Sequence, residues 1–253
     1  MFSASWWAEA TSETPWGILL LLVATACSTA AVDTTVTTSN ATTTTIAPTR
    51  TTTSTLVPTT TSTLVPTFEG AIDDVDAVRL AHSWHEGCPI EPTELDLVTV
   101  SYLGFDGETH SGLIVVHAEH SRTVMAVFES LFDNRYPIES MIPISDLPEG
   151  IEDDDPKYSN TSGFHCRVVA GTDRWSEHAF GMAIDLNPHL NPFVNDDDIW
   201  PSASEPYVDR SLGEPGMIAE GDAVTQAFDS IGWDWGGRWQ SLKDYQHFSA
   251  TGR

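Results

Sequence analysis

Positive charge is scarce in this sequence. It holds 11 Lys and Arg against 37 Asp and Glu, which gives a formal net charge of −26 over 253 residues. A surface this acidic repels a phosphate backbone, so we expect no nucleic-acid partner. Long apolar runs are also missing, because the run at 17–26 covers only about ten residues, too few to cross a hydrocarbon core. The length suits one sizeable domain with additional segments.

Cysteine is nearly absent, and the first of the three cysteines has a distinctive setting. Cys27 ends the stretch "WGILLLLVATAC", whose apolar run is typical of a secretory signal. Its "ATAC" ending is similar to a bacterial lipoprotein cleavage box. We therefore expect residues 1–27 to be a signal peptide with Cys27 as the lipidated residue, which would hold an exported protein at the outer face of the cytoplasmic membrane. A cleaved signal that releases a secreted protein and an uncleaved membrane anchor are the alternatives.

Residues 28–67 have the composition of a linker. "TTTSTLVP" occurs twice in succession, at 51–58 and 59–66, and Arg50 is the one basic residue in the first 67. Thr, Ser and Pro with few apolar residues cannot bury enough surface to offset the loss of backbone entropy. We predict a disordered linker here and a single folded domain at 68–253.

The other two cysteines lie in that domain. If Cys27 is lipidated, Cys88 and Cys166 are left as a pair in an exported protein, where a disulfide is the simplest interpretation. That bond would close a loop of nearly eighty residues and contribute roughly 4 kcal/mol. A metal-ligand role for Cys166 is the alternative.

The domain mixes helical and strand patterns without a regular βαβ alternation, which favours the α+β class over a doubly wound sheet. Ser121 is the expected N-cap of one helix and Gly232 the residue just past the end of another. The predicted helices lie at 71–84, 121–136 and 221–231. The predicted strands lie at 95–103, 112–117, 164–169, 181–186 and 245–250, and the first two form a hairpin.

The stretch "SEHAFGMAIDL" places a histidine seven residues before an aspartate. A strand here would send Ile184 and its apolar neighbours to one face and Ala183 with Asp185 to the other. Gly181 lets the chain bend, which would bring His178 back towards that carboxylate. The two side chains are then candidate ligands of one metal ion.

The stretch "KDYQHF" near the C-terminus offers a third ligand, His247, with Asp244 three residues earlier. Two histidines and one carboxylate leave a position for water, which suits catalytic rather than structural zinc. Asp244 would then act as the general base. The alternatives are a surface or core histidine and an aspartate in a turn, and the spacing alone does not decide between them.

Together, "SEHAFGMAID" and "WGGRWQSLKDYQHF" resemble two motifs of the zinc D,D-carboxypeptidase/L-alanyl-D-glutamate endopeptidase family, the D-alanyl-D-alanine carboxypeptidase-like enzymes that cut peptidoglycan stem peptides. The order and separation of the motifs also fit. The resemblance extends more weakly over about 85–250 and leaves out the signal and the linker.

The resemblance implies that His178, Asp185 and His247 bind one zinc ion and that Asp244 is the catalytic base. It implies a compact α+β fold of the hedgehog/D,D-peptidase type, in which a small antiparallel sheet carries the zinc site and helices pack around it.

The resemblance also assigns supporting roles. Arg167 in "FHCR" is the candidate for holding a substrate carbonyl or carboxylate and stabilising the oxyanion, with a surface cation as the alternative. Ser176 supports the first ligand or contacts substrate, and a structural cap is the other interpretation. Gly181 and Ala183 are spacers.

The expected function is a monomeric zinc metallopeptidase that hydrolyses peptidoglycan stem peptides as a D,D-carboxypeptidase or an L,D-endopeptidase. A non-catalytic, zinc-containing cell-wall-binding module is the alternative, although a pure binder would not need Asp244. A zinc hydrolase for another small peptide or amide would share the same site.

Overall fold

The structure is a computed structural model that describes residues 66–148, 159–196 and 198–252. The predicted signal peptide, Cys27 and nearly all of the predicted linker lie outside the described residues. Within the described ranges, none of the helices is both long and apolar enough to span a membrane.

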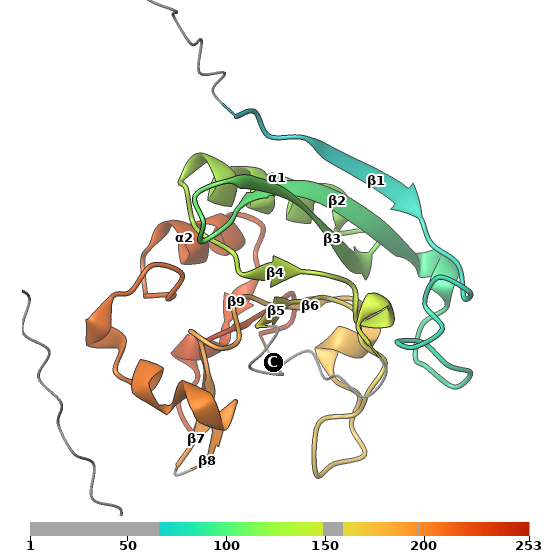
Figure 1. The fold of residues 1–253 in the computed structure, drawn as a ribbon. Helices are drawn as coiled ribbons and strands as arrows, with labels where there is room; N and C mark the ends of the chain where they lie inside the picture. The colour runs from blue at the N-terminus through green and yellow to red at the C-terminus, as the bar shows by residue number, and fades with distance from the viewer. Residues whose placement is uncertain (1–65, 149–158, 197, 253) are drawn as a thin grey trace, which may run out of the picture. The chain divides into compact units, whose positions relative to one another are not determined.

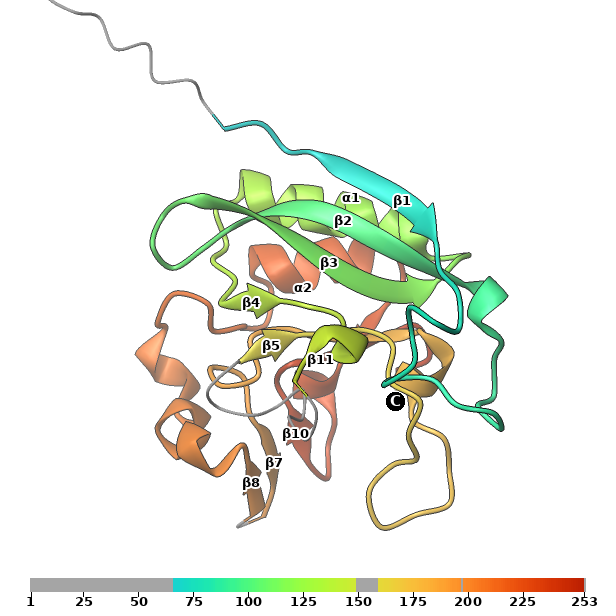
Figure 2. The same ribbon diagram turned by 45° about the vertical axis from the view of Figure 1, so that its right-hand side comes forward.

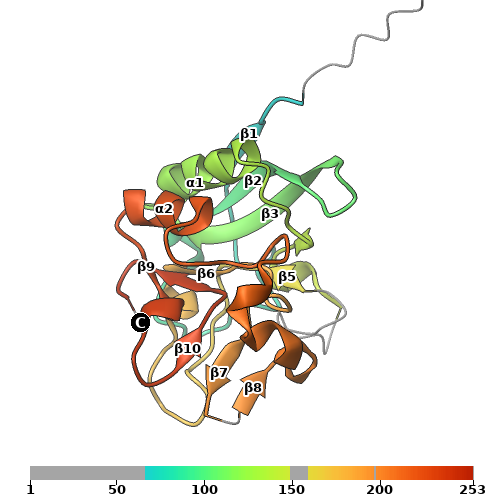
Figure 3. The same cartoon turned by 90° about the vertical axis from the view of Figure 1, so that its left-hand side faces the viewer.

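The first layer of the domain is a three-stranded antiparallel sheet in the order β1-β2-β3 (Figure 1). Its strands are β1 Gly70–Asp74, β2 Leu95–Leu103 and β3 Thr109–His117. Helix α1, Ser121–Asp133, packs along β2 on one face of this sheet (Figure 2). Helix α2, Ala223–Ser230, packs beside α1 (Figure 3).

Smaller sheets complete the domain. One is antiparallel in the order β6-β11-β9, with β6 Ala183–Asp185, β11 His247–Ser249 and β9 Asp234–Trp235. Another has the order β10-β7-β8, with β10 Lys243–Asp244, β7 Phe193–Asn195 and β8 Asp198–Trp200. Strands β4 Ser140–Met141 and β5 Asn160–Thr161 form a parallel pair. These sheets and the two α-helices confirm the α+β class.

The main core lies between the first sheet, the two α-helices and the β6-β11-β9 sheet. Ile184 and Leu186 lie in this core, as the alternation of the predicted strand required. The rings of Phe228 in α2 and Phe248 in β11 stack with centroids 3.9 Å apart. The strand that carries His247 is therefore fixed to the core through its next residue.

The predicted helix at 71–84 is wrong. Residues 70–74 form β1, whose Ile72 pairs with Val98 of β2, and turns follow. Val78, in the turns that follow β1, is 84% exposed. The segment forms a strand because its pairing satisfies the backbone N–H and C=O groups along the edge of β2. If residues 70–74 were helical, those groups of β2 would have no partner in this segment.

Two further expectations need correction. Ser121 is the first residue of α1 rather than its cap, and its hydroxyl donates to Ala118 O at 3.0 Å. Residues 164–169 form no strand: Val168 makes one isolated bridge, to Trp175. No single ladder forms, because successive backbone amides of this segment donate to three different parts of the chain, at Val115 O, His178 O and Ser83 O. The hairpin is confirmed, and so is Gly232, which follows α2 with a φ of 79°.

Candidate active site

Asp185 and His247 are brought together by strand register. Strands β6 and β11 pair so that His247 lies opposite Asp185 and Phe248 opposite Ile184. Directly paired residues point to the same face, so the two polar side chains share one face while the apolar pair enters the core. His247 Nδ1 lies 3.0 Å from Asp185 Oδ1.

His178 comes from a different element, the 3-10 helix Glu177–Phe180. Ser176 caps this helix, and its hydroxyl accepts from His178 N at 3.3 Å. The helix ends at Gly181, which has a φ of 65°, and a Cβ there would lie 2.6 Å from His117 N. Only glycine lets the chain turn this close to β3 and enter β6. Ser176 thus has the capping role, which supports the first candidate ligand.

A backbone carbonyl fixes the orientation of the His178 ring. His178 Nδ1 donates to Gly163 O at 2.7 Å, so Nδ1 carries the proton and Nε2 is the ring nitrogen with a lone pair for a metal ion. His178 Nε2 lies 3.1 Å from Asp185 Oδ2 and 3.3 Å from His247 Nδ1. Gly163 is required here, since a Cβ would lie 2.3 Å from Val115 O.

The three predicted ligands thus converge. One donor atom each from His178, Asp185 and His247 lies within 4.8 Å of the other two, and all three residues are buried. Burial alone would raise the pKa of Asp185, but the charges and hydrogen bonds of the two imidazoles hold that pKa well below its usual range. A carboxylate that stays ionised beside two imidazole nitrogens is a donor set that can hold a metal ion.

Asp244 lies in β10, next to this group. Its Oδ1 is closed off from solvent and has no hydrogen-bond partner within the described residues. Burial, followed by the negative charge of Asp185, raises the pKa of Asp244 to about 6. The side chain of Gln246 acts in the opposite direction through a hydrogen bond. A carboxyl group with this pKa can take up and release a proton near neutral pH.

The Trp-Gly-Gly segment makes room for Asp244. A Cβ on Gly236 would lie 2.6 Å from Asp244 O and 2.9 Å from its Cβ. Lys243 closes the loop that follows, since its Nζ donates to Gly237 O at 3.0 Å and to Trp239 O at 2.6 Å. The Trp239 ring lies 5.5 Å from that of His247, centroid to centroid.

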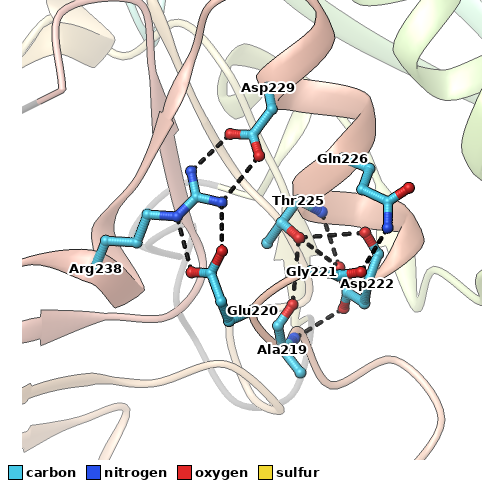
Figure 4. Close-up of polar contacts among 8 residues, drawn as sticks. All are labelled: Ala219, Glu220, Gly221, Asp222, Thr225, Gln226, Asp229 and Arg238. Carbon is cyan, nitrogen blue, oxygen red and sulfur yellow. Dashed lines mark hydrogen bonds and ion pairs between the residues drawn. The ribbon is translucent and has the colours of Figure 1, made fainter.

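A double ion pair attaches the same segment to α2, through Asp229, and to the loop before α2, through Glu220 (Figure 4). Arg238 Nη1 and Nη2 contact the Asp229 carboxylate at 2.6 and 2.9 Å. Arg238 Nε and Nη2 contact the Glu220 carboxylate, both at 2.8 Å. Because both contacts are bidentate, they fix the guanidinium plane as well as its position.

Arg167 lies beside the 3-10 helix that carries His178. Within the described residues, no contact joins its side chain to His178, Asp185 or His247. The Arg167 carbonyl accepts from Ser176 N at 3.1 Å, and His165 N donates to His178 O at 3.1 Å. The side chain is half-buried and forms no ion pair with any residue that the structure describes. Its role towards substrate stays a prediction.

The disulfide between Cys88 and Cys166 is present, and the two positions have a sequence separation of 78. Cys166 N also donates to Ser83 O at 2.9 Å. The bond ties the start of the domain to the segment that carries Arg167. Lipidation of Cys27, the third cysteine, stays a prediction.

Sequence reasoning missed three contributors to the site. Gly163 acts through its carbonyl and Gln246 through its amide, so neither belongs to a residue type that points to metal chemistry. Trp239 lies within the quoted C-terminal motif, and that position was the available signal. The role of the Gly163 carbonyl could not be predicted from the sequence. A long-range contact of the next residue, Phe164, with Val115 brings this carbonyl to His178.

Comparison with known proteins supports this arrangement. Residues 170–250 match the family model described as D-alanyl-D-alanine carboxypeptidase. The matched segment includes His178, Asp185, Asp244 and His247, whereas Arg167 lies just before it. No curated protein and no solved structure matches the chain. The match confirms, for residues 170–250, the resemblance that the two motifs carry.

Proposed function

We propose that this protein is a zinc-dependent metallopeptidase that hydrolyses peptide bonds in peptidoglycan stem peptides. The observation that carries the proposal is the convergence of His178, Asp185 and His247 beside Asp244, a carboxyl group with an unpartnered buried oxygen. The family match supports peptidoglycan peptides as the proposed substrate class. Export to the cell envelope through the N-terminal segment, with lipid at Cys27, belongs to the same proposal.

The donor set fits zinc. His178 Nε2 lies 3.3 Å from His247 Nδ1, close to the separation of about 3.4 Å expected between two ligand atoms of tetrahedral zinc with bonds of about 2.1 Å. The two imidazoles contact different oxygens of Asp185, His178 at 3.1 Å and His247 at 3.0 Å. The hydrogen bond from His178 Nδ1 to Gly163 O is the outer contact that zinc-binding histidines usually make. The three side chains would hold the ion and leave one coordination position open.

The chemistry that zinc supplies at such donors is polarisation of a carbonyl oxygen and a lower pKa for water. The Asp244 carboxylate takes a proton from the attacking water while the oxygen of that water bonds to the carbonyl carbon. The same carboxyl group then gives that proton to the leaving amine as the C–N bond breaks. Arg167 is proposed to hold a substrate carbonyl or carboxylate.

A binding module that keeps the metal but has no turnover is the competing function. Such a module has no use for a carboxyl group held beside the donors with a pKa near 6. Asp244 therefore favours the enzyme.

The test uses the full chain loaded with zinc and defined stem peptides, with products identified by mass spectrometry. Asp244→Asn is expected to lower kcat by roughly 100-fold or more while zinc content is unchanged. Asp173→Asn, at an exposed position, is the matched control and is expected to retain full activity. Equal activity of Asp244→Asn and the wild type would remove Asp244 from the mechanism, and cleavage by neither protein would favour the binding module. The products also identify the bond that is cut.

A further inference from the structure

A second hollow lies apart from the metal-binding side chains. It is a cavity of about 410 Å³ bounded by Phe105 in the β2–β3 loop, His189 and Leu190 after β6, and Tyr207 in the 3-10 helix Ser202–Val208. Two acidic residues, Glu139 and Glu214, also line the cavity. Nothing in the catalytic chemistry above uses these residues.

The cavity is connected to the site through the backbone. His189 follows Asp185 by four residues, so the two Cα atoms are at most about 14 Å apart. Tyr245, next to Asp244, donates from its N to Pro192 O at 3.2 Å. An extended peptide advances about 3.3 Å per residue, so one substrate chain of four or five residues can reach both places.

The walls carry uncompensated negative charge. The carboxylates of Glu139 and Glu214 are exposed and form no ion pair with any residue in the described ranges. Arg210 is close by, but its guanidinium points inward, where Nη1 donates to Leu190 O at 2.7 Å and Nη2 to Ile218 O at 2.8 Å. Burial, then the charges of Asp106 and Glu139, raises the pKa of Tyr102, which is consistent with a negative field.

Aromatic and apolar surface lies beside these carboxylates. The Phe105 side chain is exposed, at 44%. The Tyr207 ring packs edge to face on His189 with centroids 5.2 Å apart, and Ser204 Oγ contacts His189 Nδ1 at 3.2 Å. Carboxylates next to aromatic faces attract an ammonium group, and Leu190 offers apolar surface to a methylene chain.

We propose that this cavity binds the alkylammonium side chain of a residue in the peptide substrate. The proposal rests on the proposed peptidase function and specifies its substrate: a stem peptide with a free side-chain amine. Glu139 and Glu214 supply the charge recognition, while the rings of Phe105 and Tyr207 supply the faces on which the ammonium group lies.

The test compares two stem peptides that differ only in a side-chain amine, free in one and acetylated in the other. For the wild-type chain we expect kcat/KM to be roughly tenfold higher for the free amine. The double variant Glu139→Gln/Glu214→Gln is expected to reduce this preference to about twofold or less and to leave cleavage of the acetylated peptide unchanged. Glu129→Gln, on the exposed side of α1, should keep the preference.

Calorimetric binding of both peptides to the Asp244→Asn chain separates this proposal from the peptidase function. Preferential binding of the free amine without any turnover in the wild type would support the cavity and contradict the enzyme. Cleavage of both peptides at equal rates, with equal binding, would overturn the cavity and leave the enzyme standing. If the double variant has the melting temperature of the wild type and still prefers the free-amine peptide to the same degree, the proposed role of the cavity is also wrong.

Discussion

Asp185 and His247 are direct cross-strand partners, and the register of two three-residue strands sets the 3.0 Å between their donor atoms. A slip of one residue would send one of the two side chains into the core. The stacked rings of Phe228 and Phe248 oppose such a slip, because they bury the opposite face of β11. The packing of the core thus determines the geometry of the candidate metal centre.

The pH dependence of activity is expected to follow Asp244. The base acts as a carboxylate, so the rate should fall as the pH drops through the pKa, which burial and Asp185 raise to about 6. A bound divalent cation lowers this pKa. We therefore predict an acid limb in kcat/KM at or slightly below pH 6.

A substitution of Gln246 tests whether the acid limb reports the pKa of Asp244. The hydrogen bond of Gln246 lowers the pKa of Asp244, so Gln246→Leu should move the acid limb to higher pH. Gln226→Leu, an exposed position on α2, should leave the limb in place. A pH–rate profile of each variant is the measurement, and an acid limb that does not move in Gln246→Leu would contradict the assigned contact.

The fit between Gly236 and Asp244 predicts a selective defect. In Gly236→Ala the new Cβ would lie 2.6 Å from Asp244 O, so the backbone that carries the base must shift. We expect kcat to fall at least tenfold, because small displacements of a positioned group are costly, while zinc content stays at the wild-type level. Steady-state kinetics with metal analysis tests this. A variant with wild-type kcat would show that the contact does not position Asp244.

The disulfide predicts a loss of stability. Replacing Cys88 and Cys166 by serine opens a loop with a sequence separation of 78, and the free energy of unfolding should fall by about 4 kcal/mol. Denaturant unfolding of the wild type and the variant, each with and without reductant, measures this. Reductant should destabilise only the wild type, and equal stability of both oxidised proteins would contradict the prediction.

The sequence allowed the local features of this fold to be predicted. The hairpin follows from alternation on both sides of a glycine-rich turn, and α1 follows from the apolar stripe of Val124, Val127, Phe128 and Leu131. Strand β1 was not predictable in this way. Its apolar spacing is compatible with a helix, and only the free edge of β2, more than twenty residues later, selects the strand.

The same limit holds for the site. The four polar residues of the two motifs were identified from their types and spacing, and the structure brings His178, Asp185 and His247 together. The support around them depends on long-range packing. Gly163 reaches His178 because Phe164 N donates to Val115 O at 2.8 Å, a contact that no local pattern encodes.

The most direct test of the account is the zinc content of the purified full chain. We predict one zinc ion per chain in the wild type and in His82→Ala, an exposed control, and none in His178→Ala or His247→Ala. Chelation of the wild type should lower its melting temperature, because the bound ion stabilises only the folded state. Well-folded wild-type protein without a stoichiometric metal ion, or equal zinc in all four proteins, would contradict the account.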